Sequence, residues 1–146
     1  MINEIFTRWE TNRKSGFLCN AILTTYSIGK SVSESKLRYF SIIISIIHKF
    51  LCMLAGCSLP YKAEIAPSVL FPHGLYGVFI SKGAQVKNGC IIFHQVTIGS
   101  SSLNSAKSPL ICENVLIGAG AKIIGQIKVA NGERIRAGHS IFHSIE

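Results

Sequence analysis

The sequence predicts a mainly β protein: a left-handed parallel β-helix over residues 63–146, preceded by an N-terminal α-helical segment over residues 1–62. Three observations predict this class. Aliphatic residues recur every six positions in the second part, and turn-forming residues recur with the same period. In the first part, apolar residues cluster at helical spacings instead. The 146 residues suffice for one regular unit joined to a small helical cap.

The aliphatic ladder has ten positions, which we call rungs, and every one is Ile or Val. The rungs are Ile80, Val86, Ile92, Ile98, Ile111, Ile117, Ile123, Val129, Ile135 and Ile141. A period of six fits neither an α-helix nor an alternating β-hairpin, but it is typical of hexapeptide repeats. Three such segments close one triangular coil, and coils stack at the strand spacing of about 4.8 Å. A further hexad at Ile65 is expected to open the ladder.

Turn-forming residues lie three positions after most rungs. They are Gly83, Gly89, Asn114, Gly120, Gly132 and Gly138, with Gln95 and Gln126 as exceptions. Gly and Asn accept the positive φ that a tight corner requires. Each hexad is therefore expected to be a short strand followed by a turn.

The ladder is interrupted between Ile98 and Ile111, which are 13 residues apart, one more than two hexads. The intervening segment 99–109, GSSSLNSAKSP, is polar and rich in serine. We expect it to leave the β-helix as a loop, and loops on a rigid scaffold often carry function.

The N-terminal part predicts helices in the segments FLCNAILTTYSI and FSIIISIIHKFL. The stretch 39–55 is strongly apolar, but His48 and Lys49 interrupt it. A membrane-spanning helix needs about 20 apolar residues, so we expect a buried or interface helix, with peripheral membrane contact as the open alternative.

The net charge of +8 favours an anionic partner such as a nucleic acid, a membrane surface or a phosphate-bearing cofactor. No nucleic-acid-binding motif is present, so nucleic acid is not expected. The five cysteines lack metal-ligand spacing, which favours free thiols in a reducing compartment and no metal site. Glu4 and Glu10 argue against a signal peptide, so the expected location is cytoplasmic, with the inner face of the membrane as an alternative.

Four segments carry a family resemblance: PHGLYGVFIS, HQVTIGS, SPLICENVLIGAGAKIIGQIKV and IRAGHS. The stretch from Ile65 to Ile141 resembles the serine O-acetyltransferases, a family of hexapeptide-repeat acyltransferases. It also resembles their short relatives in polysaccharide gene clusters, such as the colanic acid acetyltransferases. The resemblance implies a homotrimeric O-acetyltransferase that takes its acetyl group from acetyl-CoA.

By this resemblance the catalytic histidine falls on His73, which would take the proton from the acceptor hydroxyl. His94 is the second candidate and would orient the acceptor, unless it is only a solvated surface residue. The residues that the resemblance places along acetyl-CoA are Gly99, Ser100, Ala119, Gly120, Lys122 and Ala137. Lys122, Lys128, Arg134 and Arg136 are the candidates for its phosphates.

Three positions depart from the family pattern. Pro72 stands where an aspartate orients the catalytic histidine, and Ser108 replaces a second histidine of the substrate site. Glu10 is only a weak equivalent of the carboxylate that the helical half contributes. We therefore expect the acceptor to be a sugar of a surface polysaccharide (colanic acid, capsule or O-antigen). Serine, in cysteine biosynthesis, is one alternative, and a non-catalytic trimeric scaffold is another.

Overall fold

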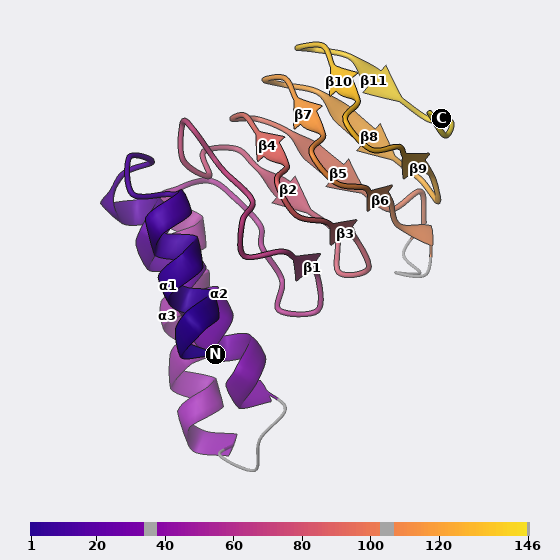
Figure 1. Ribbon diagram of the computed structural model, residues 1–146. Helices are drawn as coiled ribbons and strands as arrows, with labels where there is room; N and C mark the ends of the chain where they lie inside the picture. The colour runs from indigo at the N-terminus through magenta and orange to yellow at the C-terminus, as the bar shows by residue number, and fades with distance from the viewer. Residues whose placement is uncertain (34–37, 103–106, 146) are drawn as a thin grey trace.

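The computed structural model describes residues 1–33, 38–102 and 107–145. Three helices lie at one end of a stack of short strands (Figure 1). They are α1 (Ile2–Thr11), α2 (Phe17–Ser33) and α3 (Arg38–Leu54). The helices predicted from the two apolar segments are thus confirmed as α2 and α3. Part of the predicted serine-rich loop, residues 103–106, lies outside the described residues.

Eleven strands of two or three residues make up the β part of the described chain. They are β1 (Glu64–Ile65), β2 (Phe79–Ile80), β3 (Gln85–Val86), β4 (Ile91–Ile92), β5 (Thr97–Gly99), β6 (Leu110–Ile111), β7 (Leu116–Ile117), β8 (Lys122–Ile124), β9 (Lys128–Val129), β10 (Arg134–Ile135) and β11 (Ser140–Ile141). They form three parallel sheets: a first face β1-β3-β6-β9, a second face β4-β7-β10 and a third face β2-β5-β8-β11. The predicted parallel β-helix is confirmed.

The rungs pair with one another from coil to coil. On the third face, for example, Ile80 pairs with Ile98, Ile98 with Ile123, and Ile123 with Ile141. All ten rung side chains are buried. A second inward position follows four residues after most rungs, at Ala84, Cys90, Val96, Val115, Ala121 and Ile127, all of them buried. Two apolar side chains per hexad therefore fill the interior.

The ladder begins earlier than its strict rhythm suggests. Leu59, Ile65 and Phe71 are six residues apart and buried, and Ser58 already pairs with Phe79. The next rung, Ile80, lies nine positions after Phe71 instead of six, so this corner carries three extra residues. This insertion contains Pro72 and His73.

The second interruption also has a simple geometry. Ile98 lies on the third face, and Ile111 pairs with Val86 on the first face, which is the next face along the chain. The 13 residues from Ile98 to Ile111 therefore make one ordinary hexad with seven residues added. They are not two hexads plus one residue. The corner absorbs the insertion and the ladder keeps its register.

Two turn positions depart from expectation: Gly83 does not adopt a positive φ, whereas Gln95 does. Gln95, an exception in the turn-forming column, adopts a φ of 59°, close to the 72° of Gly120 in the next coil. Its backbone N–H donates to the carbonyl of Tyr76 at 2.9 Å, and the stacked coils hold it there. A non-glycine residue in this conformation costs roughly 1–2 kcal/mol, so stacking overrides the local preference.

Helix α3 is not the buried helix that was one of the two expectations. Within it, Ile44, His48 and Cys52 are buried, whereas nine large apolar side chains are 43–87% exposed. These are Tyr39, Phe40, Ile42, Ile43, Ile46, Ile47, Phe50, Met53 and Leu54, and we call them the α3 apolar face. Among the described residues, no helix has the length and apolar character to cross a membrane.

Candidate active site

His73 and His94 meet at the corner between the second and third faces. His73 lies in the three-residue insertion, and His94 follows rung Ile92 by two residues. Their Nδ1 atoms are 3.0 Å apart, and the ring centroids are 5.1 Å apart at a tilt of 31°. The edge of one ring meets the face of the other where Phe93 packs against His73, at a centroid distance of 5.2 Å. The structure thus brings together the two predicted catalytic residues.

The Nδ1–Nδ1 contact constrains the protons. Two nitrogens at this distance form a hydrogen bond only if one carries a proton and the other offers a lone pair. When His73 donates through Nδ1–H, its Nε2 is an unprotonated acceptor. When His94 donates, the proton of neutral His73 sits on Nε2 instead. His73 can therefore act as a base through Nε2 only in the first arrangement, in which it donates its Nδ1 proton to His94.

A buried asparagine fixes the segment that leads to His73. The Asn12 amide nitrogen donates to the carbonyl of Val69 at 2.9 Å, and its amide oxygen accepts the Phe71 N–H at 2.8 Å. Asn12 is the residue directly after α1 and is fully buried. The end of α1 thereby holds the chain just before the insertion.

Arg8 attaches the same helix to the first coil. Its guanidinium donates to the carbonyls of Ile65 and Ala66 and lies 5.1 Å from the centre of the Tyr26 ring. Burial lowers the pKa of Arg8, which is the cost of placing a cation among carbonyls and an aromatic ring. Neither Arg8 nor Asn12 was recognised from the sequence, because their role depends on how α1 docks onto the β-helix.

A cavity of about 660 Å³ lies beside the insertion. Its lining comes from the end of α1, the turn after it, and the segment before His73: Glu10, Thr11, Arg13, Lys14, Ser15, Leu70 and Pro72. It therefore presents one carboxylate and two cationic groups next to the residue that precedes His73. Glu10 and Pro72 were identified from the family resemblance, whereas nothing in the sequence pattern marked Arg13 or Lys14.

The six predicted cofactor residues all border the third face. Ala119, Gly120 and Ala137 continue the histidine corner: Gly120 N–H donates to the His94 carbonyl, and Gly138 N–H to that of Ala119. Lys122 begins strand β8 on the third face itself. At the far end of that face, Gly99 closes strand β5 and Ser100 follows it.

The four cations proposed for phosphate binding do not share one face. Lys122 lies on the third face, and Arg136 precedes Ala137 at the histidine corner. Lys128 begins β9 on the first face, and Arg134 begins β10 on the second. Only Lys122 and Arg136 therefore lie beside the small residues that border the third face.

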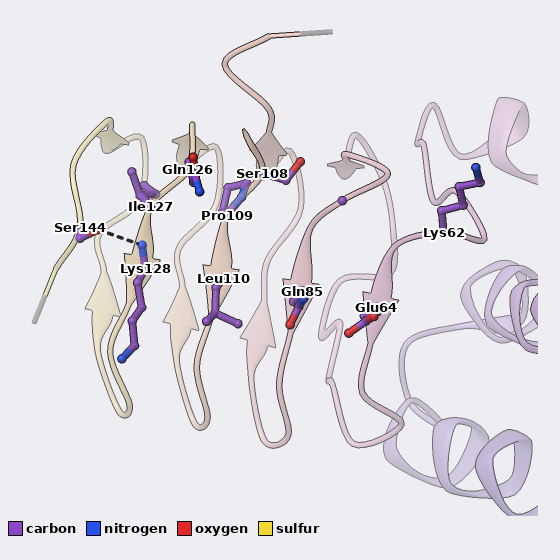
Figure 2. Close-up of a pocket in the computed structure, with 11 residues that line it drawn as sticks. Lys62, Glu64, Gln85, Ser108, Pro109, Leu110, Gln126, Ile127, Lys128 and Ser144 are labelled. Carbon is purple, nitrogen blue, oxygen red and sulfur yellow. Dashed lines mark hydrogen bonds between the residues drawn. The ribbon is translucent and has the colours of Figure 1, made fainter. Parts of the chain in front are cut away.

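Ser108 lies away from the histidines. It lines a groove of about 590 Å³ along the first face, together with outward side chains such as Glu64, Gln85 and Lys128 (Figure 2). Its hydroxyl is 3.1 Å from that of Ser81, which donates to it. Within one chain, Ser108 and His73 therefore belong to different surfaces. The described residues contain no group of three or more His, Cys, Asp or Glu side chains that could hold a metal ion.

Comparison with curated proteins finds serine acetyltransferases, while no family model matches the chain. The serine acetyltransferase of Buchnera aphidicola from Schizaphis graminum is 39% identical over 85 residues, which cover 57% of this chain and 32% of that protein. The serine acetyltransferase of Synechococcus elongatus is 33% identical over 94 residues, covering 64% and 38%. The chain therefore matches about a third of the length of these relatives.

Solved structures show the same likeness in fold. Serine acetyltransferase 1 of Entamoeba histolytica, in complex with L-cysteine, superposes with a TM-score of 0.81 at 20% identity, over 98% of this chain and 59% of that one. A soybean serine acetyltransferase complexed with serine gives 0.77 at 23% identity, over 89% and 52%. A serine acetyltransferase in complex with CoA gives 0.74 at 20% identity, over 90% and 52%. The helices and the β-helix together thus share this architecture.

Proposed function

We propose that the chain is an acetyl-CoA-dependent O-acetyltransferase in which His73 is the general base. The observation that carries the proposal is the hydrogen-bonded pair of His73 and His94 at an exposed corner. A scaffold that only stacks coils has no use for two imidazoles in contact. The similarity to serine acetyltransferases supplies the reaction class.

The proposed reaction is direct acyl transfer. Nε2 of His73 takes the proton of the acceptor hydroxyl as the oxygen attacks the thioester carbonyl of acetyl-CoA. The tetrahedral oxyanion then collapses and breaks the carbon–sulfur bond. The departing CoA thiolate recovers the proton from His73, which returns the base to its starting state.

His94 acts in this proposal as a positioning residue. The family places an aspartate before its catalytic histidine, and this chain has Pro72 there. A lone pair on His94 Nδ1 accepts the Nδ1–H of His73, which keeps Nε2 of His73 free and fixes the plane of its ring. One neutral imidazole thereby does the orienting work of the absent carboxylate.

Acetyl-CoA is proposed to lie along the third face, which ends at the histidine corner. The small residues Ala119, Gly120 and Ala137 let the pantetheine arm approach the backbone closely, and Gly99 and Ser100 continue this path. Lys122 and Arg136 are the cations placed to meet the phosphates. One of the solved neighbours is a complex with CoA, which supports the choice of co-substrate.

Serine is the acceptor that we propose. The sequence favoured a polysaccharide sugar, but the relatives and structures compared above are all named serine acetyltransferases, which supports the serine alternative better. The cavity beside Pro72 adds a physical argument. Glu10 can pair with the ammonium group of an amino acid, and Arg13 or Lys14 with its carboxylate.

The active assembly is proposed to be a homotrimer, as the family resemblance implies. His73 is exposed, and the cavity beside Pro72 is not lined by either histidine, so the corner is open on one side. A neighbouring copy would cover the open corner and bring its own groove residues, such as Ser108, toward His73. A cytoplasmic location is also proposed. Peripheral contact of the α3 apolar face with a membrane is a separate prediction, which vesicle binding would test.

The test is a free-CoA release assay with acetyl-CoA and either serine or a panel of sugars. Turnover with serine is expected, and His73→Ala should lower kcat/KM by about 10²–10⁴. His143→Ala, an exposed histidine near the end of the chain, is the matched control and should leave turnover unchanged. Full activity in His73→Ala would overturn the proposed base.

The acceptor and the positioning role have separate readouts. Glu10→Gln should raise KM for serine while kcat stays near the original value. His94→Ala should lower kcat, and His94→Asn should restore part of it, because an amide oxygen also accepts the His73 proton. Turnover with a sugar alone would favour the polysaccharide acceptor. No turnover and no acetyl-CoA binding would favour a non-catalytic scaffold.

A further inference from the structure

A pair of thiols lies where α3 ends, beside a cavity that neither His73 nor His94 lines. Gly56 has a φ of 58° directly after this helix, and the Cys57 N–H donates to the Cys52 carbonyl at 2.9 Å. The Gly56 N–H donates to the Met53 carbonyl at 3.1 Å. This is the Schellman arrangement, which brings the side chains of its first and last residues together. Those residues are here Cys52 and Cys57.

His48 lies one helical turn before Cys52, and one of its ring nitrogens faces the Cys52 sulfur. Its Nε2 is 2.8 Å from the Leu59 carbonyl, which can only accept, and 3.5 Å from the Cys52 sulfur. Its Nδ1 is 2.9 Å from the Thr25 hydroxyl, which can either donate to a ring nitrogen or accept from it. Nε2 therefore carries a proton, and it is the donor that faces both Leu59 and Cys52.

The two thiols are unequal. The hydrogen bond from Cys57, together with the His48 contact, lowers the pKa of Cys52 to about 5, although burial opposes this. The same hydrogen bond and burial raise the pKa of Cys57. For His48, burial lowers the pKa, but the hydrogen bonds with Cys52 and Leu59 outweigh it and raise the pKa. These opposite shifts favour Cys52 over Cys57 as the thiolate.

A cavity of about 530 Å³ opens beside the pair. Both cysteines and His48 line it, together with three lysines: Lys49 on α3, Lys62 in the first coil and Lys82 in the second. No Asp or Glu is among the residues that line it. The cavity therefore combines a nucleophilic sulfur, a positive lining and room for a small molecule, and it suits an anionic reagent.

We propose that Cys52 and Cys57 form a thiol–disulfide exchange site that takes small disulfides carrying carboxylates, such as glutathione disulfide. The Cys52 thiolate attacks one sulfur of the bound disulfide, forms a mixed disulfide and releases one thiolate. Cys57 then loses its proton and attacks the Cys52 sulfur, which releases the second thiolate. Two protein thiols are oxidised to one disulfide, and the bound disulfide is reduced to two thiols.

The outcome is a covalent link between the last turn of α3 and the residue that precedes the first β-bridge. Cys57 is followed by Ser58, which pairs with Phe79. The link would close the end of α3 onto the start of the β-helix. This inference does not rest on the proposed acetyltransferase activity, and its test needs no turnover.

The experiment uses the reduced 146-residue chain with glutathione disulfide at neutral pH. After quenching with a maleimide, peptide mass spectrometry locates the modified cysteines. The expected product is a Cys52–Cys57 disulfide. In Cys57→Ser the glutathione should stay on Cys52, and in Cys52→Ser neither product should form. Cys19 and Cys90 serve as controls within the same molecule: like Cys52 they are buried, but burial raises the pKa of both thiols.

Two further measurements keep the proposal open to refutation if a variant fails to fold. In the unmodified chain, the alkylation rate of Cys52 should titrate well below pH 8.5, the usual thiol value. Lys49→Ala with Lys82→Ala should slow the reaction with glutathione disulfide but not with neutral 2-hydroxyethyl disulfide. Equal rates at Cys19 and Cys52, or an ordinary titration of Cys52, would overturn the reactive site. Equal slowing with both disulfides would overturn the preference for anions.

Discussion

The helical part and the β-helix place their apolar residues by opposite rules. In the β-helix, the rungs are buried and the residues before them on each strand face outward. In α3, the majority of the large apolar side chains are exposed. Both regions are rich in isoleucine, so hydropathy alone does not distinguish core from surface. The difference lies in the partners. The six-residue period of the rungs places each one on the rung of the next coil, whereas the exposed apolar side chains of α3 have no such repeating neighbour.

The largest difference should appear when one isoleucine is shortened in each region. Ile117→Ala removes a fully buried rung and should cost about 2–5 kcal/mol in the free energy of unfolding. Ile46→Ala, at a position 63% exposed on α3, should change it by less than about 0.5 kcal/mol. Urea unfolding at one protein concentration measures both. An equal loss in Ile46→Ala would mean that an assembly covers the α3 apolar face.

Gly29→Ala tests how the helices attach to the β-helix. A Cβ on Gly29 would lie 2.2 Å from the Tyr61 ring, far inside contact distance. Alanine ordinarily stabilises a helix relative to glycine, but here overpacking should destabilise the chain by about 1–3 kcal/mol. Combining the change with Tyr61→Leu should recover stability. A gain in melting temperature for Gly29→Ala alone would contradict this close packing.

Asn12→Ala tests the connection between the two regions at the candidate site. It leaves the Phe71 N–H and the Val69 carbonyl without their buried partner, which should cost about 1–3 kcal/mol. Since Asn12 holds the segment before His73, kcat should fall as well. Asn20→Ala, whose amide donates to the carbonyls of Asn12 and Gly16, is a control within the helical part. If Asn20→Ala loses as much stability as Asn12→Ala but keeps its kcat, the fall in kcat of Asn12→Ala comes from the position of His73 and not from weaker folding.

Gln95→Gly should produce the smallest effect, and in the opposite direction. A glycine adopts the φ of 59° without steric cost, so relief of strain should stabilise the chain by up to about 1 kcal/mol. The greater flexibility of glycine in the unfolded chain offsets part of this gain. A matched change, Asn114→Gly, starts from a residue that already tolerates a φ of 58° and should gain less. Thermal unfolding of both variants makes the comparison.

The ladder could be predicted from sequence because every rung has the same neighbours. Rung residues stack on rung residues, so Ile or Val suits every rung. The resulting six-residue repeat can be recognised in the sequence. The first coil escaped this rule, since its rungs are the mixed set Leu59, Ile65 and Phe71. With Phe71 recognised as a rung, His73 and His94 would each lie two residues after a rung on the same face. Their contact was therefore within reach of the sequence.

The contacts of the helical part could not be predicted in the same way. Arg8 and Asn12 have no repeating partner, and their roles follow from where α1 docks on the first coil. The thiol pair was also missed as a unit. Free cysteines were expected, but their spacing gave no sign of the left-handed turn at Gly56 that brings Cys52 and Cys57 together.

The two corner insertions have a consequence for protein engineering. One adds three residues after Phe71 and the other adds seven after Ile98, yet the rungs on either side remain paired. Chain length at a corner is thus uncoupled from the register of the stack, and an insertion need not be a multiple of the repeat. The corners of the β-helix are therefore suitable places for grafting foreign peptides. Natural insertions there can change the surface while the buried rungs stay the same.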